Sequence, residues 1–268
     1  MSLAHLARIT LSIVDAGRYD VADGAVDFAA AVRAAVDGTR VIKPGEAVAL
    51  AATAPRDLGA RASIEVRDES TAEAARRLCV DGQVTVLNFA SAMNTGGGFL
   101  HGALAQEEDL CRCSALFRCL EQGREYYRAN DAHGGALYTD HAIWSPAVPF
   151  FRGRDYGLLP APFLVSVITS PAPNTSRVRV DEEVQLEATF QRRARQILAI
   201  AAANPPTTLV LGAWGCGAFG GDPKVVAAAF KAALDGGFDR AFARVVFAIL
   251  VRQGCDGRNP EAFRACFG

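Results

Sequence analysis

Two glycine-rich segments, each placed between a short apolar run and the start of a helix, constrain this chain most. The first follows VTVLNF (84–89) and contains the triple glycine 96–98, and the second follows TTLVLG (207–212) and contains the glycines of 215–217. A run as apolar as VTVLNF is typical of a strand buried in a central sheet. Strands that alternate with helices predict an α/β fold whose mixed or parallel sheet lies between helices. Ligands of such sheets bind outside the carboxyl ends of the strands, where both segments lie.

The spacing of apolar residues and the helix-start signals predict the other elements. Strands are expected at 62–68, 84–89, 162–169, 207–212 and 243–251. Helices are expected at 3–16, 25–37, 71–80, 105–121 and 182–203, after Asp222-Pro223 and after Asn259-Pro260. Residues 38–61 are expected to be irregular, because prolines and glycines recur there.

Composition excludes several classes of protein. The net charge of −1 shows no basic excess, so no general nucleic-acid binding is expected. Seven cysteines without a CxxC pair or a zinc-like spacing indicate free thiols in a reducing compartment. The longest apolar run, 242–251, is short and contains Arg244, and the N-terminus lacks the layout of a signal peptide. We therefore expect a soluble cytoplasmic protein without a membrane span.

The two glycine-rich segments indicate phosphate binding. Glycine lets a ligand approach the backbone, and successive N–H groups form an anion nest next to a helix N-terminus. Neither segment is a P-loop, since GK[ST] is absent, and neither fits the dinucleotide fingerprint. A single segment of this kind is more often a tight turn, but two of them suggest a diphosphate held between two backbone loops.

Carboxylates follow the triple glycine, in Gln106-Glu107-Glu108-Asp109. Acids in a first helical turn usually interact only with the helix dipole. On helical spacing, however, Glu108 lies nearly opposite the apolar stripe and faces either water or a cleft. A carboxylate beside a bound sugar phosphate is what glycosidic cleavage needs as acid and base. Adjacent glutamates diverge by about 100° on a helix, so Glu107 and Glu108 are expected to have different roles.

These motifs resemble those of the bacterial-type poly(ADP-ribose) glycohydrolases, a branch of the macrodomain superfamily. The triple glycine followed after seven residues by QEE matches the family signature, and the stretches 137–151, 166–174 and 211–223 also look like that branch. The resemblance implies a macrodomain-like three-layer fold in residues 61–268 with an N-terminal helical extension, residues 1–60. It implies hydrolysis of the ribose–ribose O-glycosidic bonds of the polymer, releasing ADP-ribose. We expect exo cleavage and a monomer.

The resemblance also assigns roles to residues. Glu108 would be the acid/base, acting through an oxocarbenium-like transition state, and Glu107 would orient the ribose. Phe219 would pack against the distal ribose and set its angle, although without the resemblance a core aromatic that anchors its loop is nearly as good an interpretation. The other residues expected to bind substrate are Asn94, Gly96, Gly97, Gly98, Gln106, Gly215, Cys216, Gly217 and Ala218.

The adenine-binding residue is less defined by the sequence. Macrodomains use an acid after an early strand, and here Asp68 or Glu69 is placed for that role, although either could serve only the helix dipole. Trp214 is expected to pack in the core and His101 to be solvated. The family often has a proline before the triple glycine, where this chain has Thr95, so we expect a slightly less rigid loop. The mechanism requires no metal or cofactor.

Three other functions stay open on the sequence. The same fold also hydrolyses mono-ADP-ribose from modified protein or nucleic acid. A macrodomain can also bind ADP-ribose without catalysis, although an intact QEE argues against that reading. An unrelated nucleotide-sugar enzyme with similar loops is the third. Each predicts a different preference among polymer, mono-modified protein and free nucleotides.

Overall fold

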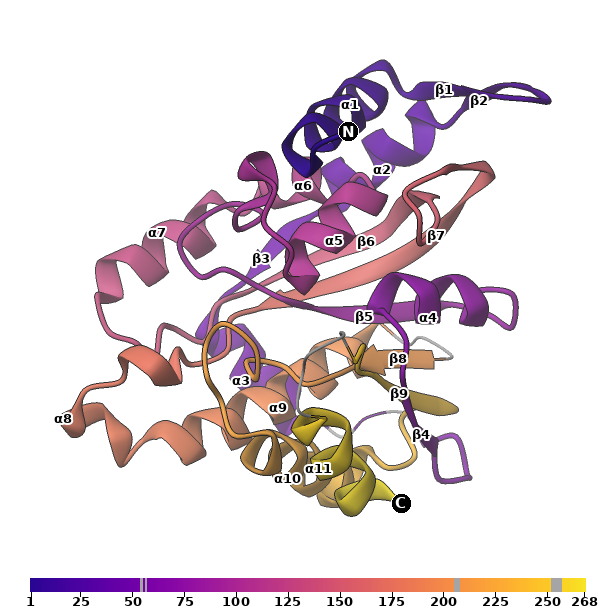
Figure 1. The fold of residues 1–268 in the computed structure, drawn as a ribbon. Coiled ribbons are helices and arrows are strands. Elements are labelled where there is room, and N and C mark those ends of the chain that lie inside the picture. The colour runs from indigo at the N-terminus through magenta and orange to yellow at the C-terminus, as the bar shows by residue number, and fades with distance from the viewer. Residues whose placement is uncertain (54, 56, 205–207, 252–256) are drawn as a thin grey trace.

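A seven-stranded mixed sheet forms the centre of the molecule, with helices on both faces (Figure 1). The computed structural model describes residues 1–53, 55, 57–204, 208–251 and 257–268. The strand order is β3-β6-β7-β5-β8-β9-β4. The bounds of the strands are β3 Arg40–Ile42, β4 Ser63–Arg67, β5 Val84–Phe89, β6 Ala142–Arg152, β7 Leu158–Ser170, β8 Thr208–Leu211 and β9 Arg244–Ala248.

The sheet divides the core into two apolar layers. Successive residues of a strand point to opposite faces, so Val86 of β5 packs into one cluster and Leu87 into the other. The first cluster is covered by α1 Leu3–Ala16, α2 Ala29–Gly38, α4 Thr71–Leu78, α5 Gln106–Cys113, α6 Leu116–Leu120 and α7 Arg124–His133. The second is covered by α3 Pro44–Ala52, α9 Leu186–Ala203, α10 Pro223–Ala233 and α11 Arg258–Phe267. The three-layer α/β class is confirmed.

Five neighbouring strands, from β7 to β4, run parallel, and β6 and β3 pair antiparallel at one edge. The carboxyl ends of β5 and β8 therefore meet at one edge of the sheet, since the two strands are direct neighbours. The chain also has a hairpin of β1 Arg18–Val21 and β2 Gly24–Asp27, and the short helix α8 Val180–Glu183. Single helical turns lie at η1 Phe99–His101, η2 Thr175–Arg177 and η3 Leu234–Phe238.

Several predicted boundaries differ from the structure. Residues 24–27 form β2, so the helix predicted at 25–37 begins only at Ala29. The segment 38–61, expected to be irregular, contains β3 and α3. The first 60 residues are thus more than a helical layer, because β3 pairs with β6 in the central sheet. The division at residue 60 stays a prediction.

The helix predicted at 105–121 is interrupted at Ser114, between α5 and α6. The Ser114 hydroxyl donates to the Leu110 carbonyl (2.7 Å) and accepts from the Leu116 amide (3.1 Å), so it replaces backbone helix bonds. Ser114 also forms a bridge with Phe150 of β6. The helix predicted at 182–203 is likewise divided into α8 and α9.

The predicted start of the helix after residue 70 is confirmed. The Ser70 hydroxyl accepts from the Glu73 amide (3.3 Å), and the Glu73 carboxylate accepts from the Ser70 amide (3.1 Å). This capping box begins α4 at the edge of the sheet where the site lies. Among the described residues, no helix combines the length and apolar character required to cross a bilayer. The cysteines described are free, and Cys255 lies outside the described residues.

Candidate active site

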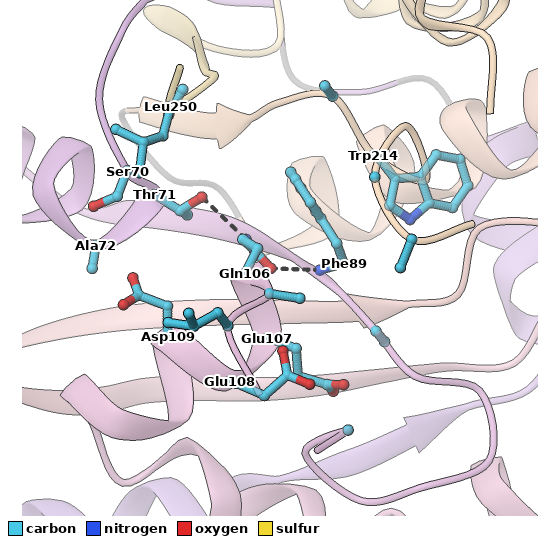
Figure 2. Close-up of a pocket in the computed structure, with 18 of the residues that line it drawn as sticks. Ser70, Thr71, Ala72, Phe89, Gln106, Glu107, Glu108, Asp109, Trp214 and Leu250 are labelled. Atoms are coloured by element: carbon cyan, nitrogen blue, oxygen red, sulfur yellow. Dashed lines mark hydrogen bonds between the residues drawn. The ribbon is translucent and has the colours of Figure 1, made fainter. Parts of the chain in front are cut away.

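The two glycine-rich segments form opposite walls of one cavity of about 1030 Å³ (Figure 2). We call residues 90–105, which join β5 to α5, the first loop, and residues 212–221, which join β8 to α10, the second loop. The predicted site residues that line this active-site cavity are Glu69, Asn94, Gly97, Gly98, Gln106, Glu107, Glu108, Gly215, Gly217, Ala218 and Phe219. Segments more than 100 residues apart in the chain are thus brought together by the β5–β8 pairing.

Gln106 joins the start of α5 to the end of β5. Its Oε1 accepts from the Phe89 amide (2.8 Å), and its Nε2 donates to the Leu87 carbonyl (2.8 Å) and to the Thr71 hydroxyl (3.1 Å). Figure 2 shows two of these bonds. Because both Nε2 hydrogens are used inside the protein, Gln106 fixes the helix that carries the two glutamates.

Glu107 is almost fully buried and bonded through both oxygens. Oε1 accepts from Asn88 Nδ2 (3.0 Å), and Oε2 accepts from the Ser91 amide (2.8 Å). Burial raises the pKa of Glu107 to about 8, although these hydrogen bonds favour the ionised form. The side chain is therefore held in one orientation. Asn88 and Ser91 were not recognised from the sequence, because only the fold places them beside Glu107.

Glu108 has one bonded oxygen and one without a partner. Its Oε1 accepts from the Gly98 amide (2.8 Å), whereas Oε2 is buried and has no hydrogen-bond partner among the described residues. The residue is 6% exposed, so of the two surroundings that the helical spacing allowed, the cleft is the one observed. A buried carboxylate oxygen without a partner is costly and is a common mark of a functional group.

Gly97 lies directly against both glutamates. Its φ is +58°, and a Cβ at this position would lie 2.5 Å from Glu108 Oε1 and 3.0 Å from Glu107 Oε2. Any side chain would displace one carboxylate or the other. The absence of a side chain at Gly97 is therefore what allows the two carboxylates to approach the first loop.

The second loop is held at its base. Trp214 is fully buried, donates from Nε1 to the Ser170 carbonyl (3.0 Å) and packs edge-on against Phe190, as expected for a core residue. Gly215 has a φ of +80°, and a Cβ there would lie 2.5 Å from Ala172 Cβ. Beyond it, Gly217 and Ala218 are exposed on the cavity wall. The loop thus combines a buried base with an open tip.

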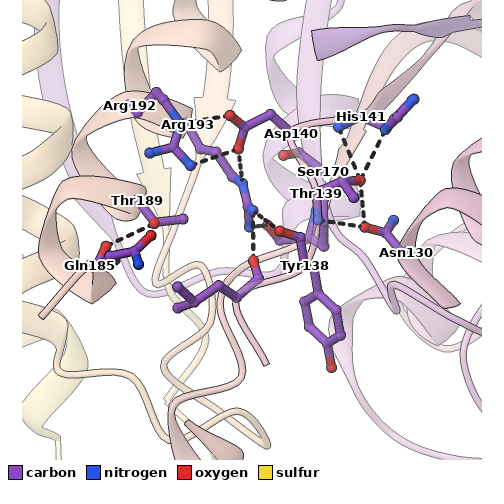
Figure 3. A network of polar contacts seen from close by, with 12 residues as sticks. Asn130, Tyr138, Thr139, Asp140, His141, Ser170, Gln185, Thr189, Arg192 and Arg193 are labelled. Carbon is purple, nitrogen blue, oxygen red and sulfur yellow. Dashed lines mark hydrogen bonds and ion pairs between the residues drawn. The ribbon is translucent and has the colours of Figure 1, made fainter. Parts of the chain in front are cut away.

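Phe219 is supported by a residue that the sequence did not single out. Its ring lies 6.2 Å from that of Tyr138, whose φ of 57° is rare for a residue with a side chain. Figure 3 shows how Arg193 fixes this backbone, since Nη2 donates to the carbonyls of Leu137 (2.6 Å) and Tyr138 (3.0 Å).

Arg193 is itself held by an ion pair with Asp140 (2.8 Å), and Asp140 also pairs with Arg192 (Figure 3). Burial opposes ionisation of Asp140, but the bonds and charges of both arginines lower its pKa. Arg193 is 1% exposed and also donates to the Pro171 carbonyl (3.0 Å). This network keeps the backbone behind Phe219 rigid.

Two predicted site residues lie outside the cavity wall. Gly96 is a buried residue of the first loop, and a Cβ there would lie 2.7 Å from the Phe117 ring. Cys216 packs against the second core cluster, and burial raises the pKa of its thiol to about 12. Both positions support the shape of their loops, and their placement does not support direct contact with a ligand.

The two acids considered for adenine differ in their surroundings. Asp68 accepts from the Val251 amide (2.8 Å) and does not line the cavity. Glu69 lines the cavity but is bonded through both oxygens to Arg77. His101 is exposed, as expected, and lies on the cavity wall. In the part of the chain that the structure describes, no cluster of His, Cys, Asp or Glu could hold a metal ion.

Residues 7–153 match the family model described as the catalytic domain of microbial-type PARG, poly(ADP-ribose) glycohydrolase. The match spans more than half of the 268 residues. The chain belongs to this family. It is therefore a glycosidase, and this PARG carries the family's GGG motif in the first loop and its QEE motif at the start of α5.

Solved structures agree with the family assignment. The PARG of Thermomonospora curvata is 42% identical, with 99% of each chain covered and a TM-score of 0.92. Its complex with the inhibitor ADP-HPD is 40% identical over 98% of each chain, with a TM-score of 0.91. The PARG of Deinococcus radiodurans in complex with ADP-ribose is 44% identical over 87% of this chain and 96% of that chain, with a TM-score of 0.83. A search of curated proteins finds no match. The chain thus has the macrodomain-like fold that the resemblance implied.

Proposed function

We propose that this PARG hydrolyses the ribose–ribose O-glycosidic bonds of poly(ADP-ribose) from the chain end, with Glu108 as the acid/base. One observation carries the assignment: Glu108 Oε2 is buried, has no partner among the described residues and lies on the active-site cavity. Family membership supports the poly(ADP-ribose) substrate. The complex of the Deinococcus radiodurans relative with ADP-ribose supports a cavity that fits one terminal unit.

The reaction proceeds in two proton transfers. In the first, protonated Glu108 gives its proton to the bridging oxygen as the bond from that oxygen to the anomeric carbon breaks. An oxocarbenium-like centre forms on the ribose that stays bound. In the second, water adds to this carbon and returns a proton to the Glu108 carboxylate. The net change is the addition of one water, and Glu108 ends in its starting state.

Glu107 serves as the positioning carboxyl of this mechanism. Both of its oxygens already accept hydrogen bonds from Asn88 and Ser91, so its orientation is fixed before substrate enters. A carboxyl held in this way favours one orientation of the bound ribose, while the Gly98 amide holds Glu108 on the cavity wall (2.8 Å). We place Phe219, supported by Tyr138, on the opposite side of the same ribose.

Replacement of Glu108 tests the proposal. We expect Glu108→Gln to lower the release of ADP-ribose from purified polymer by at least about a thousandfold, because the amide cannot donate a proton from that position. Binding of ADP-ribose, measured by calorimetry, is expected to change little. Glu183→Gln, an exposed acid outside the cavity, is the matched control. Full activity of Glu108→Gln would refute the assignment.

The products distinguish exo from endo cleavage and polymer from mono-modified substrates. Exo-acting hydrolysis releases free ADP-ribose from the start, without intermediate oligomers. Faster release from mono-modified protein or DNA than from polymer would favour the mono-ADP-ribosyl hydrolase instead. We also propose a cytoplasmic location, supported by the free cysteines described. The monomeric state stays a prediction.

A further inference from the structure

A second cavity of about 340 Å³ adjoins the active-site cavity, between α4 and the turn that joins β6 to β7. We call it the arginine pocket, because its charged walls are Arg76, Arg77, Arg152, Arg154 and Glu73. Ala72, Glu73 and Arg154 line both cavities, so the two spaces meet along this wall. None of these residues takes part in the mechanism proposed above.

Arg152 is a buried cation without a carboxylate partner. The residue is 6% exposed, and its guanidinium donates only to neutral oxygens, the Thr10 hydroxyl (3.3 Å) and the Tyr156 carbonyl (2.7 Å). No ion pair joins it to any acid among the residues described. Burial accordingly lowers its pKa. A buried charge is costly unless an opposite charge compensates it, so an anion in this pocket would stabilise Arg152.

Two further arginines are available at the mouth of the pocket. Arg76, in the last turn of α4, is exposed and forms no ion pair with the described part of the chain. The Arg154 side chain is 76% exposed and has only a long contact with Glu73 (3.4 Å). Arg77 differs, because Glu69 neutralises it. The pocket therefore keeps a positive excess after its own acids are counted.

We propose that the arginine pocket binds the diphosphate of the ADP-ribose unit adjacent to the one held in the active-site cavity. Guanidinium groups bind phosphate oxygens in a bidentate manner, and a diphosphate offers enough oxygens for several of them. Continuity with the active-site cavity favours a second unit of the same polymer over an unrelated anion. This inference rests on the proposed action on poly(ADP-ribose).

The polymer dependence of the kinetics tests the inference. In the double variant Arg76→Gln/Arg154→Gln, we expect the KM for purified polymer to rise roughly tenfold and its salt dependence to weaken, because two phosphate contacts are lost. The kcat is expected to stay within about twofold, and the Kd for ADP-ribose alone to stay unchanged. Arg33→Gln, an exposed arginine on α2 that lines neither cavity, is the control.

Direct binding tests the pocket without catalysis. With ADP-ribose saturating the active-site cavity, inorganic pyrophosphate is titrated into the wild type and the double variant by calorimetry. We expect binding to the wild type that the double variant loses. An unchanged KM would overturn the inference, as would pyrophosphate binding with no effect on KM, which indicates a site for free anions only.

The remaining outcomes separate the two proposals. A parallel loss of ADP-ribose affinity in the double variant would show that the arginines bind the unit held in the active-site cavity, and it would overturn a separate diphosphate site. A wild type that binds ADP-ribose but releases none from polymer would contradict the proposed function instead. In that case the pyrophosphate titration still decides whether the arginine pocket binds a diphosphate.

Discussion

The first and second loops both contain glycines at the carboxyl end of a parallel strand, but they need them for different reasons. In the first loop, the space beside Gly97 is occupied by the carboxylates of Glu107 and Glu108. In the second loop, a Cβ on Gly217 would meet no atom within 4 Å. One loop is packed against the two glutamates and the other opens toward solvent at its tip.

The hydrogen bonds of the loops agree with this contrast. The Gly98 amide of the first loop donates to Glu108, and the Ser91 amide donates to Glu107. In the second loop, the Gly220 and Gly221 amides donate to the carbonyls of Gly217 and Gly215 (both 2.9 Å) instead of to a carboxylate. The Phe219 carbonyl accepts from the Ser176 amide outside the loop (3.0 Å). The first loop therefore fixes the two carboxylates, whereas the tip of the second loop is exposed on the cavity wall.

Replacement of Gly97 tests the contrast most strongly. We expect Gly97→Ala to lower kcat by about a hundredfold or more, because the new methyl group displaces Glu108 and the positive φ is strained. Steady-state hydrolysis of polymer measures the effect, and thermal unfolding verifies that the variant is folded. A folded variant with the wild-type kcat would show that the carboxylates tolerate displacement. The two loops would then not differ in their need for glycine.

At the base of the second loop, the expected effect is on binding. Gly215→Ala introduces a methyl group against Ala172 at a φ of +80° and is expected to destabilise the fold by about 2 kcal/mol. Because the loop shifts, we expect the Kd for ADP-ribose to rise about tenfold, with a smaller change in kcat. Calorimetry and denaturant unfolding provide the two readouts. A loss confined to kcat would assign a catalytic role to the second loop.

The buried Glu107, which accepts from the Ser91 amide of the first loop, gives this side of the site a pH dependence near neutral pH. The pKa of Glu107 is about 8 in the folded protein against an ordinary value of 4.5, so between these values the folded state holds the proton that the unfolded state has released. Stability therefore falls as pH rises through this window. In Glu107→Gln, we expect the Tm to fall by several degrees less between pH 5 and pH 8 than in the wild type. If the Tm of the variant, the wild type and Glu183→Gln fell in parallel with pH, the pH dependence of stability would not come from Glu107.

The tip of the second loop is expected to respond least. Gly217→Ala adds a methyl group in open space. We therefore expect the kcat to stay within about twofold of the wild-type value and the free energy of unfolding to change little. The same assays as for Gly97→Ala apply, which makes the two substitutions a matched pair. A large loss in Gly217→Ala would mean that a ligand approaches this backbone too closely for a side chain.

The sequence predicted the parts of the site that depend on local pattern. Val84–Phe89 and Thr208–Leu211 formed neighbouring strands, and QEE opened a helix beside the triple glycine, because apolar runs and glycine loops act over a few residues. The positions of Glu107 and Glu108 on the active-site cavity follow from this order. The roles assigned to them remain predictions that the variants above test.

Other features depended on contacts that no local pattern contains. The strand β6 includes Pro146 and Pro149, which weaken the strand signal, and its pairing with β3 and β7 decides its structure. The Ser114 break depends on β6 as well. Tyr138 and Arg193 support Phe219 only because α9 packs beside the segment 137–140.

The pairing of β5 with β8 has a consequence for how this protein is made. During synthesis, the segment bearing the QEE motif leaves the ribosome well before the second loop has been translated. The nascent chain therefore carries the two acidic side chains before the second loop can complete the cavity. Long-range strand pairing of this kind forms slowly. Competence to capture a nucleotide should therefore arise abruptly and late, when the centre of the sheet closes, and a ribosome-stalled chain ending before β8 should be unable to retain one.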